Sequence, residues 1–213
     1  MCVLDAAAKQ AEVDGLLRRY PHLRGAAGGH GAQPGQRDAA SVGDHTPTGH
    51  PGGTSLVHPA LRGCEDVPWG DIPGCPADIP AVLHGLLDPA AAPDAARVLT
   101  NVLVAGLFHL GEAMPYALPF VLRLAVEPRA LERARLLDLV LVAAELCRSV
   151  DPDNPREVLL LGHEADHPER ARCRTVFREQ AALVRALLDD PSVAREPADA
   201  EDRALLEEVA GGG

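Results

Sequence analysis

The chain has 213 residues, of which 46% are hydrophobic but only 3% aromatic, and its formal net charge is −11. This length fits one domain with an extension, and a core of Leu, Val and Ala favours packed helices over a β-sandwich, whose strands prefer aromatic and β-branched side chains. The acidic balance argues against a nucleic-acid partner, because such a protein needs a basic face that replaces the phosphate counterions.

The cysteines are odd in number and show no metal-ligand spacing, which predicts reduced thiols and no metal site: Cys2, Cys64, Cys75, Cys147 and Cys173. The N-terminus lacks the charged start, apolar run and cleavage site of a signal peptide. The most apolar stretch, residues 136–147, is shorter than the roughly 20 residues that cross a bilayer. We therefore expect a cytoplasmic protein with no membrane partner and no cofactor.

The N-terminal segment, residues 1–24, contains one predicted amphipathic helix over residues 3–20, which Pro21 ends. This helix either docks onto the rest of the protein or frays, as short isolated helices do. Residues 25–66 are rich in Gly and Pro and show no apolar period, which predicts a disordered linker. The linker carries four irregularly spaced histidines, which favours solvated side chains over a metal-binding tail: His30, His45, His50 and His58.

A repeat begins in the predicted folded domain, residues 67–210. Residues 78–89 (DIPAVLHGLLDP) align with residues 117–128 (ALPFVLRLAVEP) at an offset of 39 residues. In both copies a proline, Pro80 or Pro119, is predicted in the first turn of a short helix, where its missing N–H costs nothing. Residues 181–191 form a weaker third copy. His84, on the first repeat helix, reads as a partly buried side chain.

Partner helices are predicted between and after the repeat copies, over residues 94–110, 129–147, 168–188 and 199–209. Residues 136–147 (LLDLVLVAAELC) are apolar nearly all round, so this helix should be central and covered on most of its surface. Two helices per unit with a period near 40 residues are typical of a HEAT or armadillo solenoid.

Three stretches carry a family resemblance: residues 77–83 (ADIPAVL), 108–111 (FHLG) and 118–122 (LPFVL). Together they resemble the bacterial HEAT-repeat domain proteins, although Leu110 and Glu112 depart from the family pattern. The resemblance implies an all-α fold, a short HEAT-like superhelix of armadillo type, here with a disordered N-terminal extension. It also implies an interaction role and no reaction, so we expect a non-catalytic protein–protein interaction scaffold.

The candidate partner-binding residues lie at the end of the predicted 94–110 helix and in the loop that follows it: Phe108, His109, Gly111 and Tyr116. His109 has a structural explanation as well, because a protonated histidine is stabilised by the dipole at a helix C-terminus.

Two stretches suggest other functions. His163-Glu164-Ala165-Asp166-His167 matches the H-E-x-x-H pattern of zinc hydrolases, which needs both histidines on one face of a helix. Pro168 disfavours a helical conformation at His167, so we expect a loop leading into the next helix.

Arg170, Arg174 and Arg178 are spaced by four residues and would share a helix face. This face either binds nucleic acid or a phosphate ligand, or it is solvated and paired with Glu169 and neighbouring carboxylates.

Overall fold

The computed structural model describes residues 4–27, 58–190 and 200–211, and within these ranges the chain is helical without a β-strand. This confirms the all-α prediction. The α-helices are α1 (Ala6–Arg19), α2 (His22–Ala27), α3 (Ile79–Gly85), α4 (Ala92–Leu103), α5 (Met114–Val126), α6 (Arg133–Leu146), α7 (Pro155–Leu161), α8 (Pro168–Glu179), α9 (Ala181–Asp189) and α10 (Ala200–Gly211). Short 3-10 turns are η1 (Pro59–Leu61), η2 (Cys64–Asp66), η3 (Trp69–Asp71) and η4 (Glu164–Asp166). The linker residues 28–57 lie outside the described ranges.

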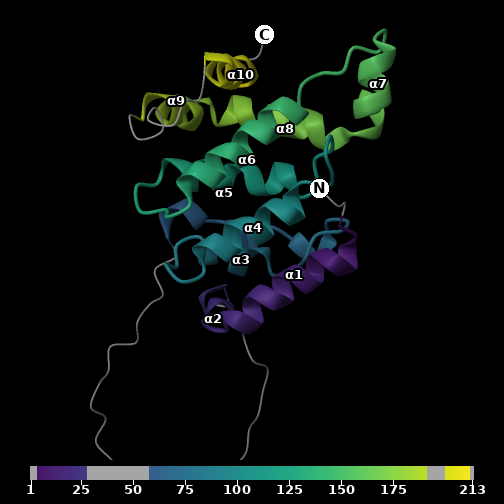
Figure 1. Cartoon of the computed structure of the whole chain (residues 1–213). Coiled ribbons are helices and arrows are strands. Elements are labelled where there is room, and N and C mark those ends of the chain that lie inside the picture. The colour runs from purple at the N-terminus through teal and green to yellow at the C-terminus, as the bar shows by residue number, and fades with distance from the viewer. Residues whose placement is uncertain (1–3, 28–57, 191–199, 212–213) are drawn as a thin grey trace, which may run out of the picture.

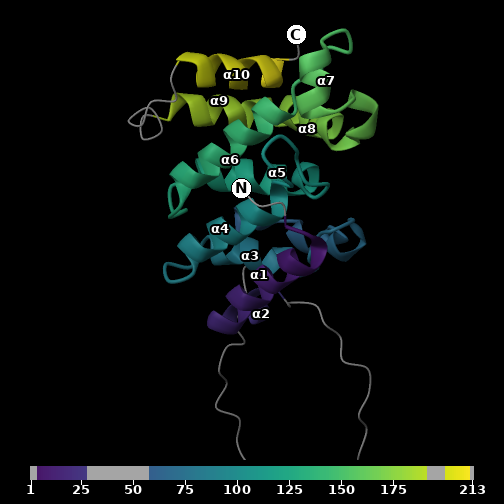
Figure 2. The same cartoon turned by 45° about the vertical axis from the view of Figure 1, so that its right-hand side comes forward.

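The helices are stacked along the molecule broadly in chain order (Figures 1 and 2). Helices α1 and α2 lie at one end, α3 packs on α4, α5 packs on α6, and α8 to α10 lie at the other end. A continuous cluster of buried apolar side chains connects these layers. None of the helices in the described ranges combines the length and apolar character that crossing a lipid bilayer requires.

The predicted central helix is α6, which contacts α4, α5, α8 and α10. Its buried side chains face these neighbours: Leu136, Leu137, Leu139, Val140, Ala143 and Ala144. Coverage is incomplete, however, because Val142 remains 38% exposed. The surface of α6 at Val142 is therefore exposed.

Helix α4 ends at Leu103, so the prediction of a helix over residues 94–110 was wrong at its C-terminal end. The backbone of Val104 is extended (φ −105°, ψ 114°), and the chain turns back through a short hairpin closed by an antiparallel bridge between Val104 and Leu110. Two backbone bonds hold this 104–110 hairpin: Ala105 N–H donates to the His109 carbonyl at 2.9 Å, and Gly111 N–H donates to the Leu103 carbonyl at 2.7 Å. An apolar run cannot by itself tell a continuing helix from a packed hairpin.

The repeat prolines differ in position. Pro80 lies in the first turn of α3, as predicted. Pro119 lies inside α5, because this helix begins earlier, at Met114, with Pro115 in its first turn. The missing N–H of Pro119 would have bonded the Pro115 carbonyl, so only one bond near the start of the helix is lost.

The C-terminal helices also differ from the prediction of one helix over residues 168–188. The chain breaks at Gln180 (φ −100°, ψ 18°), which separates α8 from α9. The third repeat copy therefore begins its own helix at Ala181. Helix α10 matches the helix predicted over residues 199–209 to within two residues at each end.

The N-terminal helix α1 is docked. Val13 and Leu17 are fully buried, and α1 contacts α3 and α4. Lys9, the one lysine of the chain, is only 7% exposed, and its Nζ donates to the carbonyl of Val102 at 2.8 Å. Burial lowers the pKa of Lys9, whereas its position at the last turn of α4 favours the positive charge.

The folded part begins before the predicted boundary at residue 67. Leu61 and Cys64 are fully buried, and Trp69 is 3% exposed. The Trp69 indole Nε1 donates to the Cys64 carbonyl at 2.8 Å, and its ring lies 6.2 Å from that of Phe120. The turns η1, η2 and η3 each bury one or two side chains and show no regular spacing of apolar residues. The sequence pattern therefore gave no indication that residues 58–66 belong to the folded part.

Candidate functional site

The 104–110 hairpin forms one wall of an exposed apolar groove. The groove has a volume of about 570 Å³ and lies between the hairpin, the C-terminal end of α6, and α7. Its lining is mostly apolar, with a polar rim: Leu107, Phe108, Val142, Leu146, Leu160 and Leu161, with Glu145, Asn154, Arg156 and Glu157. Leu107 is 66% exposed and Leu160 is 41% exposed.

Helix α7 completes the groove but buries none of its own residues. Local signals define it: the Asn154 side chain accepts from the N–H groups of Arg156 and Glu157, Pro155 fills the first turn, and Gly162 ends the helix at a positive φ of 74°. Leu159 is 85% exposed, and the helix stands at the edge of the molecule (Figure 1). An apolar helix that its own chain leaves uncovered is typical of an interaction surface.

His109 fixes the base of the hairpin. Its ring lies 4.9 Å from the ring of His167, whose Nδ1 is 2.9 Å from the Glu169 carboxylate. Burial lowers the pKa of His109, and the charges of His167 and Arg170 lower it further. The helix-dipole explanation for His109 was wrong, because α4 ends at Leu103 and the site favours the neutral imidazole.

The four residues predicted to bind a partner lie in different parts of the structure. Phe108 is 36% exposed and lines the groove. Gly111 sits against the end of α4, where an added Cβ would lie 3.0 Å from the Leu103 carbonyl oxygen. Tyr116 is 38% exposed in the first turn of α5 and is not part of the groove lining. The sequence analysis missed helix α7, although Asn154, Pro155 and Gly162 mark its ends, and it missed the contribution of α6, which depends on long-range packing.

The H-E-x-x-H stretch does not form one helix. Glu164–Asp166 is the 3-10 turn η4, and α8 begins at Pro168 with His167 at its N-cap position. Glu164 pairs with Arg174, and His167 faces His109. The stretch is a loop leading into the next helix, as expected, so the two histidines lack the shared helix face that the zinc motif requires.

The three arginines of α8 do not present an open basic face. Arg170 is fully buried, and its Nη2 donates to the Leu161 carbonyl. Arg174 donates to the Cys147 carbonyl at 2.5 Å and pairs with Glu164, so it connects α8 to the end of α6. The alternative of pairing with nearby carboxylates holds for Arg174 and Glu164, whereas a pairing with Glu169 is absent from the described contacts, since that carboxylate is 5% exposed and bonds His167.

Comparison with known proteins does not identify the chain. No family model matches it, and no curated protein or solved structure is similar to it at a significant level.

The lowered pKa of His109 predicts a loss of stability in mild acid. The unfolded chain takes up a proton at this residue near pH 6.5, whereas the folded chain takes it up only at lower pH. The free energy of unfolding should therefore be highest above pH 6.5 and fall as the pH decreases through this range. Urea unfolding at about pH 7.5 and about pH 5.5 measures the difference, which should be smaller in His109→Gln. An unchanged difference in that variant would contradict the prediction.

Proposed function

We propose that this chain is a non-catalytic protein–protein interaction scaffold with a short HEAT-like superhelix. The stacking of helix pairs in chain order and the 39-residue offset between the α3 and α5 repeats support the architecture. The resemblance of residues 77–83, 108–111 and 118–122 to HEAT-repeat domain proteins agrees with it. In such arrays each pair buries its face against its neighbours, which leaves extended surfaces for partners.

The single observation that carries the interaction role is the apolar groove. Large apolar side chains gather there from three separate elements of the chain, Leu107 and Phe108 from the hairpin, Val142 from α6 and Leu160 from α7. Contiguous exposed apolar surface rimmed by polar groups marks sites where another molecule binds. A groove of about 570 Å³ accepts a few anchoring side chains of one helix or extended segment.

The rim charges favour a particular kind of partner. Glu145 and Glu157 flank the groove beside one Arg156, and the whole chain carries a net charge of −11. A complementary partner is an amphipathic segment with apolar anchors and basic flanking residues. Free thiols at Cys64, Cys75, Cys147 and Cys173 agree with a cytoplasmic location for this encounter.

A displayed peptide library selected against the intact chain tests the proposal. We expect enriched peptides to carry apolar residues at helical spacing with basic flanks. Leu107→Ser and Leu160→Ser should each weaken their binding by at least about tenfold, since truncated hot-spot side chains cost about 1–2 kcal/mol or more. The matched control is Leu131→Ser, because Leu131 is 53% exposed but lies outside the groove. Binding that survives both groove variants, or that Leu131→Ser abolishes equally, would overturn the proposal.

A further inference from the structure

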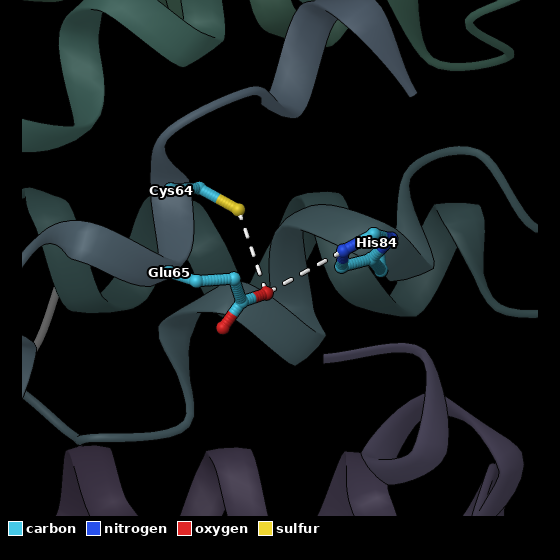
Figure 3. A group of neighbouring side chains, drawn as sticks. All are labelled: Cys64, Glu65 and His84. Carbon is cyan, nitrogen blue, oxygen red and sulfur yellow. Dashed lines mark hydrogen bonds and ion pairs between the residues drawn. The ribbon is translucent and has the colours of Figure 1, made fainter. Parts of the chain in front are cut away.

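Three side chains of metal-ligand type converge away from the groove. Cys64 and Glu65 come from the turn η2, and His84 comes from the last turn of α3 (Figure 3). The Cys64 Sγ lies 3.7 Å from the Glu65 Oε1, and the His84 Nε2 lies 3.6 Å from the same oxygen. All three donor atoms are within 4.8 Å of one another. No other group of three such donors is this close together within the described residues.

The imidazole of His84 is the unsatisfied member of this cluster. Its side chain is 13% exposed, and its buried Nε2 makes no hydrogen bond: the Glu65 Oε1, 3.6 Å away, is an ion-pair contact beyond hydrogen-bond distance (Figure 3). Buried polar atoms in native proteins nearly always have a partner. Burial lowers the pKa of His84, and the nearby His58 lowers it further. With the ring proton on Nδ1, a neutral imidazole offers a lone pair at Nε2 to a metal ion.

Two of the three donor separations are close to those of a zinc site, and the third, between the Cys64 Sγ and the His84 Nε2, is within 4.8 Å. Zinc takes sulfur, nitrogen and carboxylate ligands at about 2.0–2.3 Å, so neighbouring ligand atoms of a tetrahedral site lie about 3.4–3.6 Å apart. The separations of 3.6 and 3.7 Å are close to this value. We propose that Cys64, Glu65 and His84 bind one zinc ion, with the fourth position open to water.

The exposure of the three side chains shows how a zinc ion would enter the site, and the Cys64 thiol carries the proton that the ion would displace. The Glu65 side chain is 39% exposed, which gives a path from solvent, whereas Cys64 is fully buried. Burial and the Glu65 charge raise the pKa of the Cys64 thiol to about 12, so the thiol is protonated without metal. The S–H bond breaks as the sulfur–zinc bond forms, and the proton leaves to solvent, so binding should strengthen as pH rises.

Neighbouring charges bear on the same site. The guanidinium of Arg123 stabilises the thiolate form of Cys64. His58 faces His84 and lies 3.8 Å from Glu127, and Asp66 adds negative charge beside Glu65. A bound ion would fasten the 58–66 segment to α3. The site shares no residue with the groove lining, so zinc binding and the proposed interaction role can be tested independently.

Metal titration of the intact chain tests this inference. The protein is reduced with a phosphine, stripped with a chelator and titrated with Zn²⁺ against a chromophoric chelator. We expect one zinc per chain. Replacing zinc by Co²⁺ should give a thiolate-to-cobalt charge-transfer band in the near ultraviolet, which reports the sulfur ligand directly.

Matched variants then assign the ligands. Cys64→Ser, Glu65→Gln and His84→Gln should each weaken zinc binding by at least about tenfold, since even residues that only support a metal ligand cost that much. Cys75→Ser, which removes a half-buried free thiol outside the cluster, should leave binding unchanged. Glu65→Gln keeps the test valid should the buried variants unfold, because Glu65 is the exposed member. No zinc bound by the native chain, or unaltered binding by Glu65→Gln, would overturn the inference.

Discussion

Replacing Phe177 with alanine is expected to lower the free energy of unfolding by about 3–5 kcal/mol, the range for removing a large buried aromatic side chain. Phe177 is fully buried on α8, which packs against α5, α6 and α10. The cavity would therefore lie where the C-terminal helices join the central pair. Urea unfolding followed by circular dichroism measures the change.

The control for this prediction is Leu159→Ala. Leu159 is 85% exposed on α7, and exposed substitutions usually change the free energy of unfolding by no more than about 0.5 kcal/mol. Both variants remove a large apolar side chain, so the comparison isolates the effect of burial. Equal losses in the two variants would mean that α8 does not pack as described.

Local sequence signals predicted most of the helices. A nearly continuous apolar run located α6, and Pro80 placed the start of α3. The same signals failed at the end of α4, because the apolar residues 94–110 are compatible with either a continuing helix or a hairpin. The choice is made by tertiary contacts, here the bond from the Gly111 N–H to the Leu103 carbonyl and the ring contact of His109.

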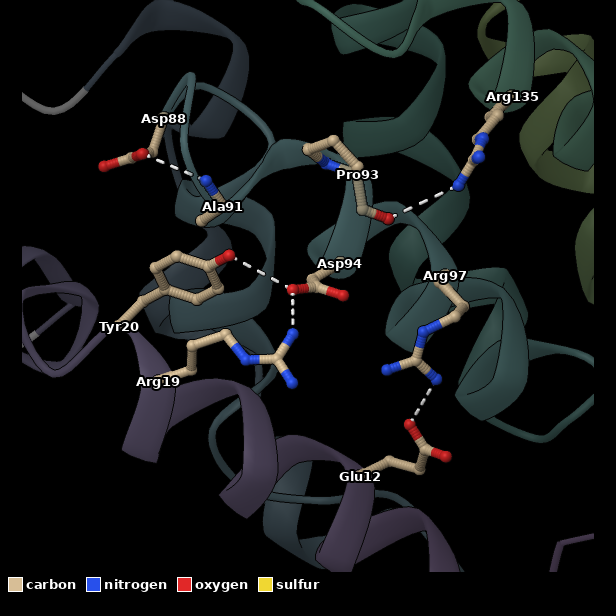
Figure 4. Close-up of polar contacts among 9 residues, drawn as sticks. All are labelled: Glu12, Arg19, Tyr20, Asp88, Ala91, Pro93, Asp94, Arg97 and Arg135. Carbon is tan, nitrogen blue, oxygen red and sulfur yellow. Dashed lines mark hydrogen bonds and ion pairs between the residues drawn. The ribbon is translucent and has the colours of Figure 1, made fainter.

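The docking of α1 was left open by the sequence, since it depends on pairs far apart in the chain. Arg19 and Tyr20 both bond the Asp94 carboxylate, at 2.5 and 3.1 Å (Figure 4). Arg97 pairs with Glu12 at 2.6 Å on the same face. Exposed ion pairs of this kind contribute little energy, so the buried apolar residues of α1 supply most of the attachment and the polar pairs fix its orientation.

The candidate sites were only partly predictable for the same reason. The family resemblance directed attention to Phe108, which does line the groove. Val142 was expected to be covered, and nothing in residues 155–161 indicated that this helix would stay uncovered. Cys64 and His84 form no sequence motif, because η2 and α3 are separated along the chain and bring these side chains together only in the fold. The positions of the cysteines carry no signal for a site that takes one Cys, one Glu and one His from two separate elements.

Gly111→Ala is expected to destabilise the fold by about 1–3 kcal/mol, the range for overpacking a well-packed site. The new Cβ would lie 3.0 Å from the Leu103 carbonyl oxygen and 3.1 Å from that of Val102. Neither oxygen is free to move, because the first accepts from the Gly111 N–H and the second from Lys9. The strain should therefore displace the 104–110 hairpin, and Phe108 with it, so peptides selected on the groove should also bind the variant more weakly.

Gly15→Ala is the control for Gly111→Ala, because it is expected to raise the stability of the fold rather than lower it. Gly15 lies within α1, and an added Cβ there would meet nothing within 4 Å. Alanine in a helix interior is favoured over glycine by up to about 1 kcal/mol, so this variant should be more stable than the native chain and should bind the same peptides equally well. Thermal unfolding and peptide titration of both variants measure the two effects separately. A Gly111→Ala chain as stable as Gly15→Ala would show that the hairpin is not held against the end of α4, and the groove would then lose the wall that Phe108 provides.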